Sequence, residues 1–142
     1  MINEFRGEYS FLSNFYEAEV TYNGITYQNS EAAYQAQKVK DKEEQMKFAN
    51  LKPGKAKRMG RKVQIRDDWE EVKNQYMYDI CMAKFIQNKD LEEKLLATDN
   101  EYLEEGNTWG DKIWGTVNGE GQNRLGKILM AVREDIRGFN YD

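Results

Sequence analysis

Residues 18–39 read AEVTYNGITYQNSEAAYQAQKV and contain the change from strand to helix that sets the fold class. The first part alternates apolar and polar side chains on both sides of Asn23-Gly24, a dipeptide that favours the left-handed conformations of a type I′ turn. Ser30 then offers an N-cap for a helix over residues 31–39, which contain alanines and long unbranched side chains. The stretch therefore predicts a β-hairpin followed directly by a helix.

Five further helices are predicted outside this stretch. Capping boxes mark two starts, at Asp41 and at Asp90, and Pro53 suits the first turn of a short helix. The last helix is expected over residues 122–136, and the longest over residues 68–87. Because 142 residues suffice for one core, we expect a single α+β domain over residues 1–142, predominantly helical with a small antiparallel β-sheet.

The longest helix is predicted to supply the core with one apolar stripe. The stripe comprises Trp69, Val72, Tyr76, Ile80 and Ala83. Lys84 lies at its edge, and we expect this side chain to snorkel toward water. The alternative is burial, which would desolvate the amine and make it more nucleophilic.

The composition restricts the available chemistry. The chain has no histidine, which excludes Ser-His-Asp triads, Cys-His pairs and histidine-ligated zinc or iron. Its one cysteine, Cys81, cannot form an internal disulfide, and its apolar neighbours suggest burial. We expect neither a metal nor another cofactor. Catalysis would fall to Asp, Glu or Lys, as in glycosidic cleavage or Schiff-base formation.

Charge and hydropathy bear on location and partners. The formal net charge of −4 argues against a protein that binds duplex nucleic acid through the electrostatic field of its whole surface. No apolar run approaches the ~20 residues of a membrane span, and no signal peptide is recognisable, so we expect a cytoplasmic protein without membrane contact. One local stretch is basic, and solvated lysines are favoured there over a nucleic-acid or phosphate surface. It contains Lys52, Lys55, Lys57, Arg58, Arg61, Lys62 and Arg66.

Two segments carry candidate chemistry. Glu31, Gln35 and Lys38 fall on one face of the predicted helix over residues 31–39, and a solvated polar face is favoured over a catalytic one. Residues 107–123 combine glycines with two tryptophans, which is typical of a binding loop. Within this loop Asp111 and Trp114 either face one cavity or form a structural turn.

Six segments in order and spacing resemble the NADAR/YbiA-like family over nearly the whole chain. They are 11–16 (FLSNFY), 30–38 (SEAAYQAQK), 84–88 (KFIQN), 95–98 (LLAT), 114–115 (WG) and 123–130 (NRLGKILM). This family commonly has histidine where Ala32 stands, and the matching acid, tyrosine, glutamine and lysine remain. The resemblance implies a mainly helical fold with a small antiparallel sheet.

The resemblance also implies an N-glycosidase that hydrolyses the N-glycosidic bond of a phosphorylated ribose conjugate. Some relatives act on phosphoribosylated intermediates of riboflavin biosynthesis, and others remove ADP-ribose from guanine. Glu31 or Asp111 would supply the negative charge and orient water. In the guanine-specific relatives a lysine is thought to form a Schiff base, and Lys38 matches it best, with Lys84 as the alternative.

The same resemblance yields the substrate-binding residues. Trp69, Trp109 or Trp114 would stack on the base, which is worth about 1–3 kcal/mol per stacked base in nucleic-acid binders. Backbone N–H groups of the glycine-rich loop, with Asn14, Arg6 or Arg124, would hold phosphate. The full set is Arg6, Ser13, Asn14, Phe15, Tyr34, Trp69, Lys84, Trp109, Trp114, Gly115, Asn123 and Arg124.

Three expectations follow for partners and for the rival function. The partner is either a phosphoribosylated small molecule or an ADP-ribosylated nucleobase. The basic stretch 52–66 is where nucleic acid would bind, as the alternative to a set of solvated lysines. The segments carrying Glu31, Asp111 and Trp114 should converge on one cleft. A non-catalytic ADP-ribose or NAD sensor with the same residues is the alternative, and it would bind without turnover.

Overall fold

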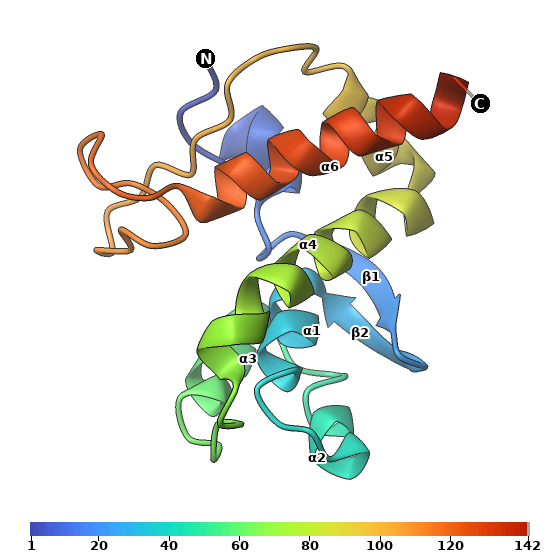
Figure 1. Cartoon of the computed structure of the whole chain (residues 1–142), viewed down its shortest axis with the longest axis vertical. Coiled ribbons are helices and arrows are strands. Elements are labelled where there is room, and N and C mark those ends of the chain that lie inside the picture. Colours follow the sequence, from blue (N-terminus) through green and yellow to red (C-terminus); the bar gives the residue numbers. More distant parts are fainter. Residues whose placement is uncertain (142) are drawn as a thin grey trace. The chain divides into compact units, whose positions relative to one another are not determined.

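The computed structural model describes residues 1–141, which cluster into two compact units. One unit comprises residues 14–89, and the other comprises residues 1–13 and the chain from Asp90 onward. Figure 1 labels their helices and strands. The elements are mainly helices with a small antiparallel sheet, so the predicted α+β class is confirmed. That residues 1–142 form one domain stays a prediction.

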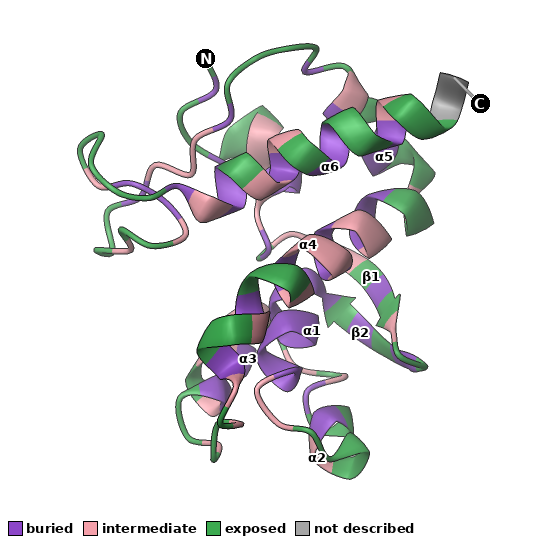
Figure 2. Cartoon of the chain, in the orientation of Figure 1, coloured by how far each residue is buried: buried purple, intermediate pink, exposed green. Residues whose placement is uncertain are grey.

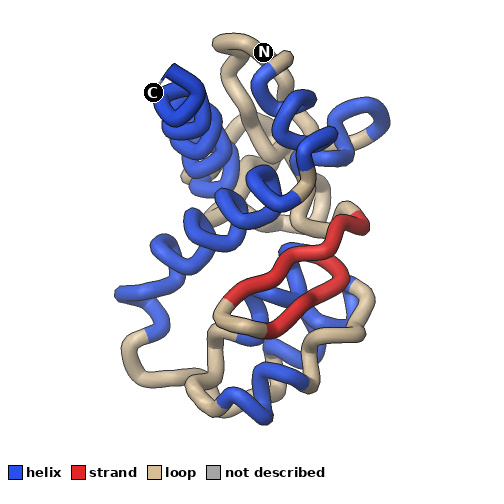
Figure 3. Tube along the Cα trace, turned by 90° about the vertical axis from the view of Figure 1, so that its right-hand side faces the viewer, coloured by secondary structure: helices blue, strands red, loops and turns tan. Residues whose placement is uncertain are grey.

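The hairpin forms where the sequence predicts it. Strands β1 (Glu17–Tyr22) and β2 (Ile25–Asn29) pair antiparallel, with Tyr22 opposite Ile25 and Val20 opposite Tyr27. The ribbon is coloured red in Figure 3. Asn23 and Gly24 connect the strands with φ values of 50° and 81°, both in the left-handed region that a type I′ turn needs.

Helix α1 (Ser30–Ala36) is shorter than predicted and begins with a different cap. The side chain of Asn29, not that of Ser30, accepts the N–H of Ala32 at 2.8 Å. The Ser30 hydroxyl instead donates to Asn14. All seven residues of α1 are buried (Figure 2), because the hairpin and helices α3 and α4 contact it.

Helix α4 (Trp69–Gln87) confirms the longest predicted helix but turns a different stripe inward. Val72, Tyr76 and Ala83 are only half-buried. Two of the buried positions are lysines, which an apolar pattern leaves out. The buried stripe is Trp69, Lys73, Met77, Ile80, Cys81, Lys84 and Phe85.

Two short helices complete the 14–89 unit. Helix α2 (Lys42–Met46) begins after Asp41, whose carboxylate accepts the N–H of Glu44 at 3.1 Å. Helix α3 (Pro53–Gly60) begins at Pro53. Both predicted starts are confirmed, and α3 packs against α1.

The second unit contains a 3₁₀ helix, η1 (Gly7–Leu12), and helices α5 (Lys89–Leu96) and α6 (Arg124–Tyr141). Helix α5 already begins at Lys89, and Asp90 lies in its first turn. The prediction that Asp90 is the N-cap is therefore wrong. Leu125, Leu129 and Val132 of α6 are buried, and Ile128 is half-buried. Within residues 1–141, no helix combines the length and apolar character that a bilayer span requires.

Candidate active site

The start of α1 is fixed by Asn14. Its backbone carbonyl accepts the N–H of Glu31 at 3.1 Å, and its side-chain oxygen accepts the Ser30 hydroxyl at 2.9 Å. Its amide nitrogen lies 3.2 Å from the sulfur of Met77 in α4. The Asn14 side chain is thus engaged in joining α1 to α4, and holding a phosphate would compete with these bonds.

Glu31 is a buried carboxylate, 9% exposed. Its Oε2 accepts a 2.6 Å hydrogen bond from Nε2 of Gln35, one turn further along α1. The favoured prediction of a solvated polar face is therefore wrong, because neighbouring helices cover this face of α1. The amide oxygen of Gln35, Oε1, is buried and has no hydrogen-bond partner among the described residues.

Gly60 closes the space beside Gln35 at the end of α3. A Cβ at this position would collide with the side-chain amide of Gln35, so only glycine fits without movement. The Gly60 carbonyl also accepts a hydrogen bond from Nζ of Lys38 at 3.3 Å. Gly60 thus contacts the side chains of both Gln35 and Lys38.

Lys38 lies in the turn after α1, half-buried. Burial lowers the pKa of its amine, and the charge of Glu31 opposes this shift. The cations Arg61, Lys73 and Lys57 lower the pKa further. The net direction is downward, so a larger fraction of the amine is unprotonated than in a free lysine at the same pH.

Aromatic rings line the region between α1 and α4. The ring of Tyr34 lies 5.2 Å from that of Trp69, and Trp69 stacks on Tyr76 at 6.4 Å. Tyr34 and Trp69 are almost fully buried. Phe15, in contrast, is 45% exposed, and the amine of Lys57 lies 6.0 Å from its ring centre.

Lys84 is buried, with 1% of its surface exposed, so the predicted snorkelling is wrong. Burial lowers the pKa of its amine to about 8, although the charge of Cys81 raises this pKa in part. The amine lies 5.8 Å from the ring of Tyr16 and 5.2 Å from that of Phe85. Cys81 is buried as expected, and burial raises the pKa of its thiol to about 12.

The Asp111 side chain caps a turn in the second unit. Its Oδ1 accepts the N–H groups of Ile113 and Trp114 at 3.0 and 2.9 Å. The side chain of Asn107 bonds both the N–H and the carbonyl of Asp111. These bonds match the structural turn that was one of the two interpretations, and Trp114 is half-buried there.

The remaining predicted residues of this unit fall into two groups. Gly115 and Asn123 are buried and structural, because a Cβ at 115 would collide with Glu105 and the Asn123 amide bonds the backbone of Leu103 and Glu105. Three others lie nearer the surface. Arg6 lies 5.8 Å from the ring of Trp109, which is 55% exposed, and the half-buried Arg124 bonds Gln122.

Ser13 follows the last residue of η1, and its N–H donates to the carbonyl of Ser10 at 3.0 Å.

Of the predicted site residues, the structure gathers Glu31, Tyr34, Lys38 and Trp69 around α1. Their convergence with Asp111 and Trp114 stays a prediction. Sequence reasoning missed Gly60 and Lys73. A glycine ending a helix gives no signal of the side chain packed against it, and the pattern at Lys73 is that of a surface lysine.

Known proteins resemble the chain along almost its entire length. A family model described as the NADAR domain matches residues 3–137. The N-glycosidase YbiA of Shigella flexneri serotype 5b is 39% identical over 133 residues, which cover 91% of this chain and 82% of that protein. A riboflavin biosynthesis protein of Vibrio vulnificus is 38% identical over 133 residues, and the match spans 91% of this chain but 36% of that protein.

A solved structure agrees with these matches. The NMR structure of the Escherichia coli protein YbiA superposes with a TM-score of 0.86 at 34% sequence identity. The superposition covers 100% of this chain and 90% of that one.

Proposed function

Because the chain belongs to the NADAR domain family, we propose that it is an N-glycosidase, a hydrolase that cleaves the bond between a phosphorylated ribose and a nitrogen atom. The relatives named N-glycosidase support this reaction class, since they share 37–39% of their residues with this chain over more than nine-tenths of its length. The leaving base is a separate part of the proposal.

The observation that carries the proposal is a buried carboxylate whose charge interacts with a half-buried amine. Glu31 is held in one orientation by Gln35, and Lys38 is held by the carbonyl of Gly60. Both groups are shielded from bulk water. A charge acts more strongly on its neighbours in such a shielded place than it does in water. Such a pair suits a reaction that develops positive charge on a sugar.

The hydrolysis needs one acid and one water molecule. As the bond from the anomeric carbon to nitrogen breaks, its electron pair goes to nitrogen and the ribosyl group gains positive charge. Glu31 would stabilise this charge and orient the water. The water oxygen bonds the anomeric carbon, and one of its protons ends on the departing nitrogen. Asp111 is the alternative acid.

Lys38 would provide a covalent route. When the sugar ring opens, the ring oxygen takes a proton and the base stays joined to the anomeric carbon as a protonated imine. The neutral amine of Lys38 can add to this carbon and pass one proton to the base nitrogen. The bond to the base then breaks with its electron pair going to that nitrogen, and a protonated Schiff base between Lys38 and the sugar remains. Water then adds to the imine, releases the sugar aldehyde and restores the amine. The lowered pKa of Lys38 supports this role, because only the neutral amine is a nucleophile. Lys84, with its pKa near 8, is the alternative.

The cations whose charges reach Lys38 would bind the phosphate of the substrate. Lys57 and the C-cap residue Arg61 belong to α3, Lys73 belongs to α4, and all three act on the amine of Lys38. Like charges brought together in this way favour an anion. Arg6 and Arg124 remain candidates for a second phosphate, as in ADP-ribose.

Two substrates are candidates for this site, and different observations favour each. The riboflavin name of a relative supports a small phosphoribosylated metabolite. The basic stretch supports ADP-ribosylated guanine in nucleic acid, since the amine of the half-buried Lys57 lies 6.0 Å from the centre of the exposed Phe15 ring, on which a base could stack. The exposed basic residues are Lys52, Lys55, Arg58, Arg61 and Lys62.

A direct test incubates the protein with ADP-ribosylated guanine in single-stranded DNA and, separately, with phosphoribosylated riboflavin intermediates. Mass spectrometry should detect a free base and a free ribosyl product from one of them, and Glu31→Gln serves as the inactive control. Binding of either compound by the native protein without any release of base would overturn the enzyme proposal in favour of the sensor.

A further inference from the structure

The turn that carries Lys38 lies beyond the last residue of α1, Ala36. The N–H groups of Gln37, Lys38 and Val39 still bond backwards, to the carbonyls of residues 34, 35 and 36 at 3.0, 3.1 and 3.3 Å. Their own carbonyls have left the helix, so no following helical turn can serve them. Whatever donates to these three carbonyls fixes the path of the turn.

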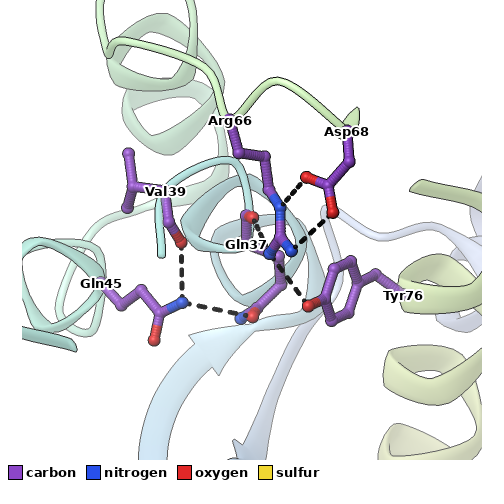
Figure 4. A network of polar contacts seen from close by, with 6 residues as sticks. All are labelled: Gln37, Val39, Gln45, Arg66, Asp68 and Tyr76. Atoms are coloured by element: carbon purple, nitrogen blue, oxygen red, sulfur yellow. Dashed lines mark hydrogen bonds and ion pairs between the residues drawn. The ribbon is translucent and has the colours of Figure 1, made fainter. Parts of the chain in front are cut away.

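Two residues supply donors to all three carbonyls, and Figure 4 shows the contacts with the carbonyls of Gln37 and Val39. The backbone N–H of Arg66 donates to the carbonyl of Lys38 at 2.8 Å, and Nη1 of the same residue lies 3.5 Å from the carbonyl of Gln37. Nε2 of the buried Gln45 donates to the carbonyl of Val39 at 2.9 Å. The turn is therefore held on both sides of Lys38 from outside α1.

Arg66 is itself rigidly anchored. Its guanidinium group makes a bidentate pair with Asp68, with distances of 2.6 and 3.1 Å, and donates to the hydroxyl of Tyr76 at 3.0 Å. It also lies 5.3 Å from the Tyr76 ring centre. Its side chain is 12% exposed. Although Arg66 belongs to the basic stretch in sequence, it is engaged in this network and unsuited to a solvated surface.

We propose that Arg66 is a positioning residue, which aims the Lys38 amine by clamping the turn over residues 37–39. The inference rests on the proposed function only for the reaction that Lys38 performs. The clamp itself can be measured without any substrate. A lysine at position 66 keeps the charge but cannot form the fork with Asp68 and reach Gln37 at once.

The first measurement follows the reactivity of Lys38 directly. An amine-acylating reagent is applied over a range of pH, and peptide mass spectrometry gives the labelling midpoint of Lys38 in the native protein, Arg66→Lys and Arg66→Met. We expect both variants to label with a midpoint shifted toward the ordinary lysine pKa of 10.5, because a loosened turn lets water reach the amine. A shift in Arg66→Met alone would attribute the effect to lost charge and overturn the clamp.

Arg133→Met is the matched control. Arg133 is also buried and also donates to a backbone carbonyl, that of Glu101 at 2.9 Å, but it belongs to the other unit. Its loss should lower stability without changing the Lys38 labelling midpoint. Equal midpoints in all four proteins would overturn the proposal, whether or not the enzyme reaction is found.

The second measurement uses the substrate that the native protein turns over. We expect kcat of Arg66→Met to fall about 10²-fold, with a much smaller change in KM, because misplacing a reacting group by about 1 Å has this cost. In Arg66→Ala, whose short side chain leaves the place of the guanidinium group open, low concentrations of guanidinium ion should restore part of kcat by occupying that place. A variant that lost activity through unfolding would lose more under guanidinium, and that result would contradict positioning. Turnover of no substrate by the native protein would defeat the proposed function and leave the labelling result to decide the clamp.

Discussion

Glu31 and Asp111 are the two acids available for the proposed reaction, and their surroundings differ at the residue scale. Glu31 uses one carboxylate oxygen to accept from Gln35. Asp111 uses one oxygen to accept two backbone N–H groups of its own turn. A carboxylate that caps a turn is fixed by local structure, whereas Glu31 is buried among helices.

Glu31→Gln should therefore lower kcat by about 10²-fold or more, the scale of a positioned acid or base, while the fold is kept because glutamine preserves the shape and can still accept from Gln35. Steady-state kinetics with circular dichroism would measure both effects. Asp111→Asn is the paired variant. Unchanged turnover in Glu31→Gln together with a large loss in Asp111→Asn would transfer the acid role to Asp111.

Lys38 gives the second prediction at this scale. If its amine forms a Schiff base, borohydride added during turnover should trap a covalent sugar adduct on Lys38, detectable by peptide mass spectrometry, and Lys38→Ala should lose the adduct and most activity. Because burial and neighbouring cations lower its pKa, activity should rise with pH as this amine loses its proton. Retained activity in Lys38→Ala without any adduct would leave direct attack by water. An adduct on Lys84 would move the role there.

At the scale of elements, the contact of α3 with α1 depends on Gly60. An added Cβ would collide with Gln35, so we expect Gly60→Ala to lower the free energy of unfolding by about 1–3 kcal/mol, as overpacking does. It should also lower kcat, because Gln35 holds Glu31 and the Gly60 carbonyl holds Lys38. Urea unfolding and kinetics would measure the two effects.

Gly138 of α6 is the matched control for this substitution. A Cβ there meets no atom within 4 Å, so Gly138→Ala should raise stability by about 0.5–1 kcal/mol through helix propensity alone. If Gly60→Ala behaved like Gly138→Ala in stability and left kcat unchanged, the packing of α3 on α1 would have no part in the site.

At the scale of the whole molecule, Lys84 links stability to pH. Its folded-state pKa, about 8, lies below the ordinary value of 10.5. Below about 8 the lysine is charged in both states, and burial of the charge opposes folding. Above about 10.5 it is neutral in both states, and this cost vanishes. The stability of the native protein relative to Lys84→Met should therefore rise as pH increases from about 8 to 10.5.

Urea unfolding of both proteins across this range measures the difference, from which the contributions of the other titrating groups cancel. Lys62→Met replaces an exposed lysine of the basic stretch. The free energy of unfolding of this variant should change with pH in parallel with that of the native protein. A constant difference between native protein and Lys84→Met would show that Lys84 titrates alike in the folded and unfolded states.

Local sequence determined the elements whose signals are local. The Asn23-Gly24 turn, the start of α2 after Asp41 and that of α3 at Pro53 depend on a few adjacent residues, and all three form as predicted. The family segments likewise identified Glu31 and Lys38 as site candidates. Tertiary structure alone decided that α1 is buried on every side, that Lys73 and Lys84 point inward, and that Arg66 and Gln45 hold the turn of Lys38. The physical reason is that burial and hydrogen-bond partners are set by elements far away in the chain, whereas a polar side chain has the same local pattern whether water or protein surrounds it.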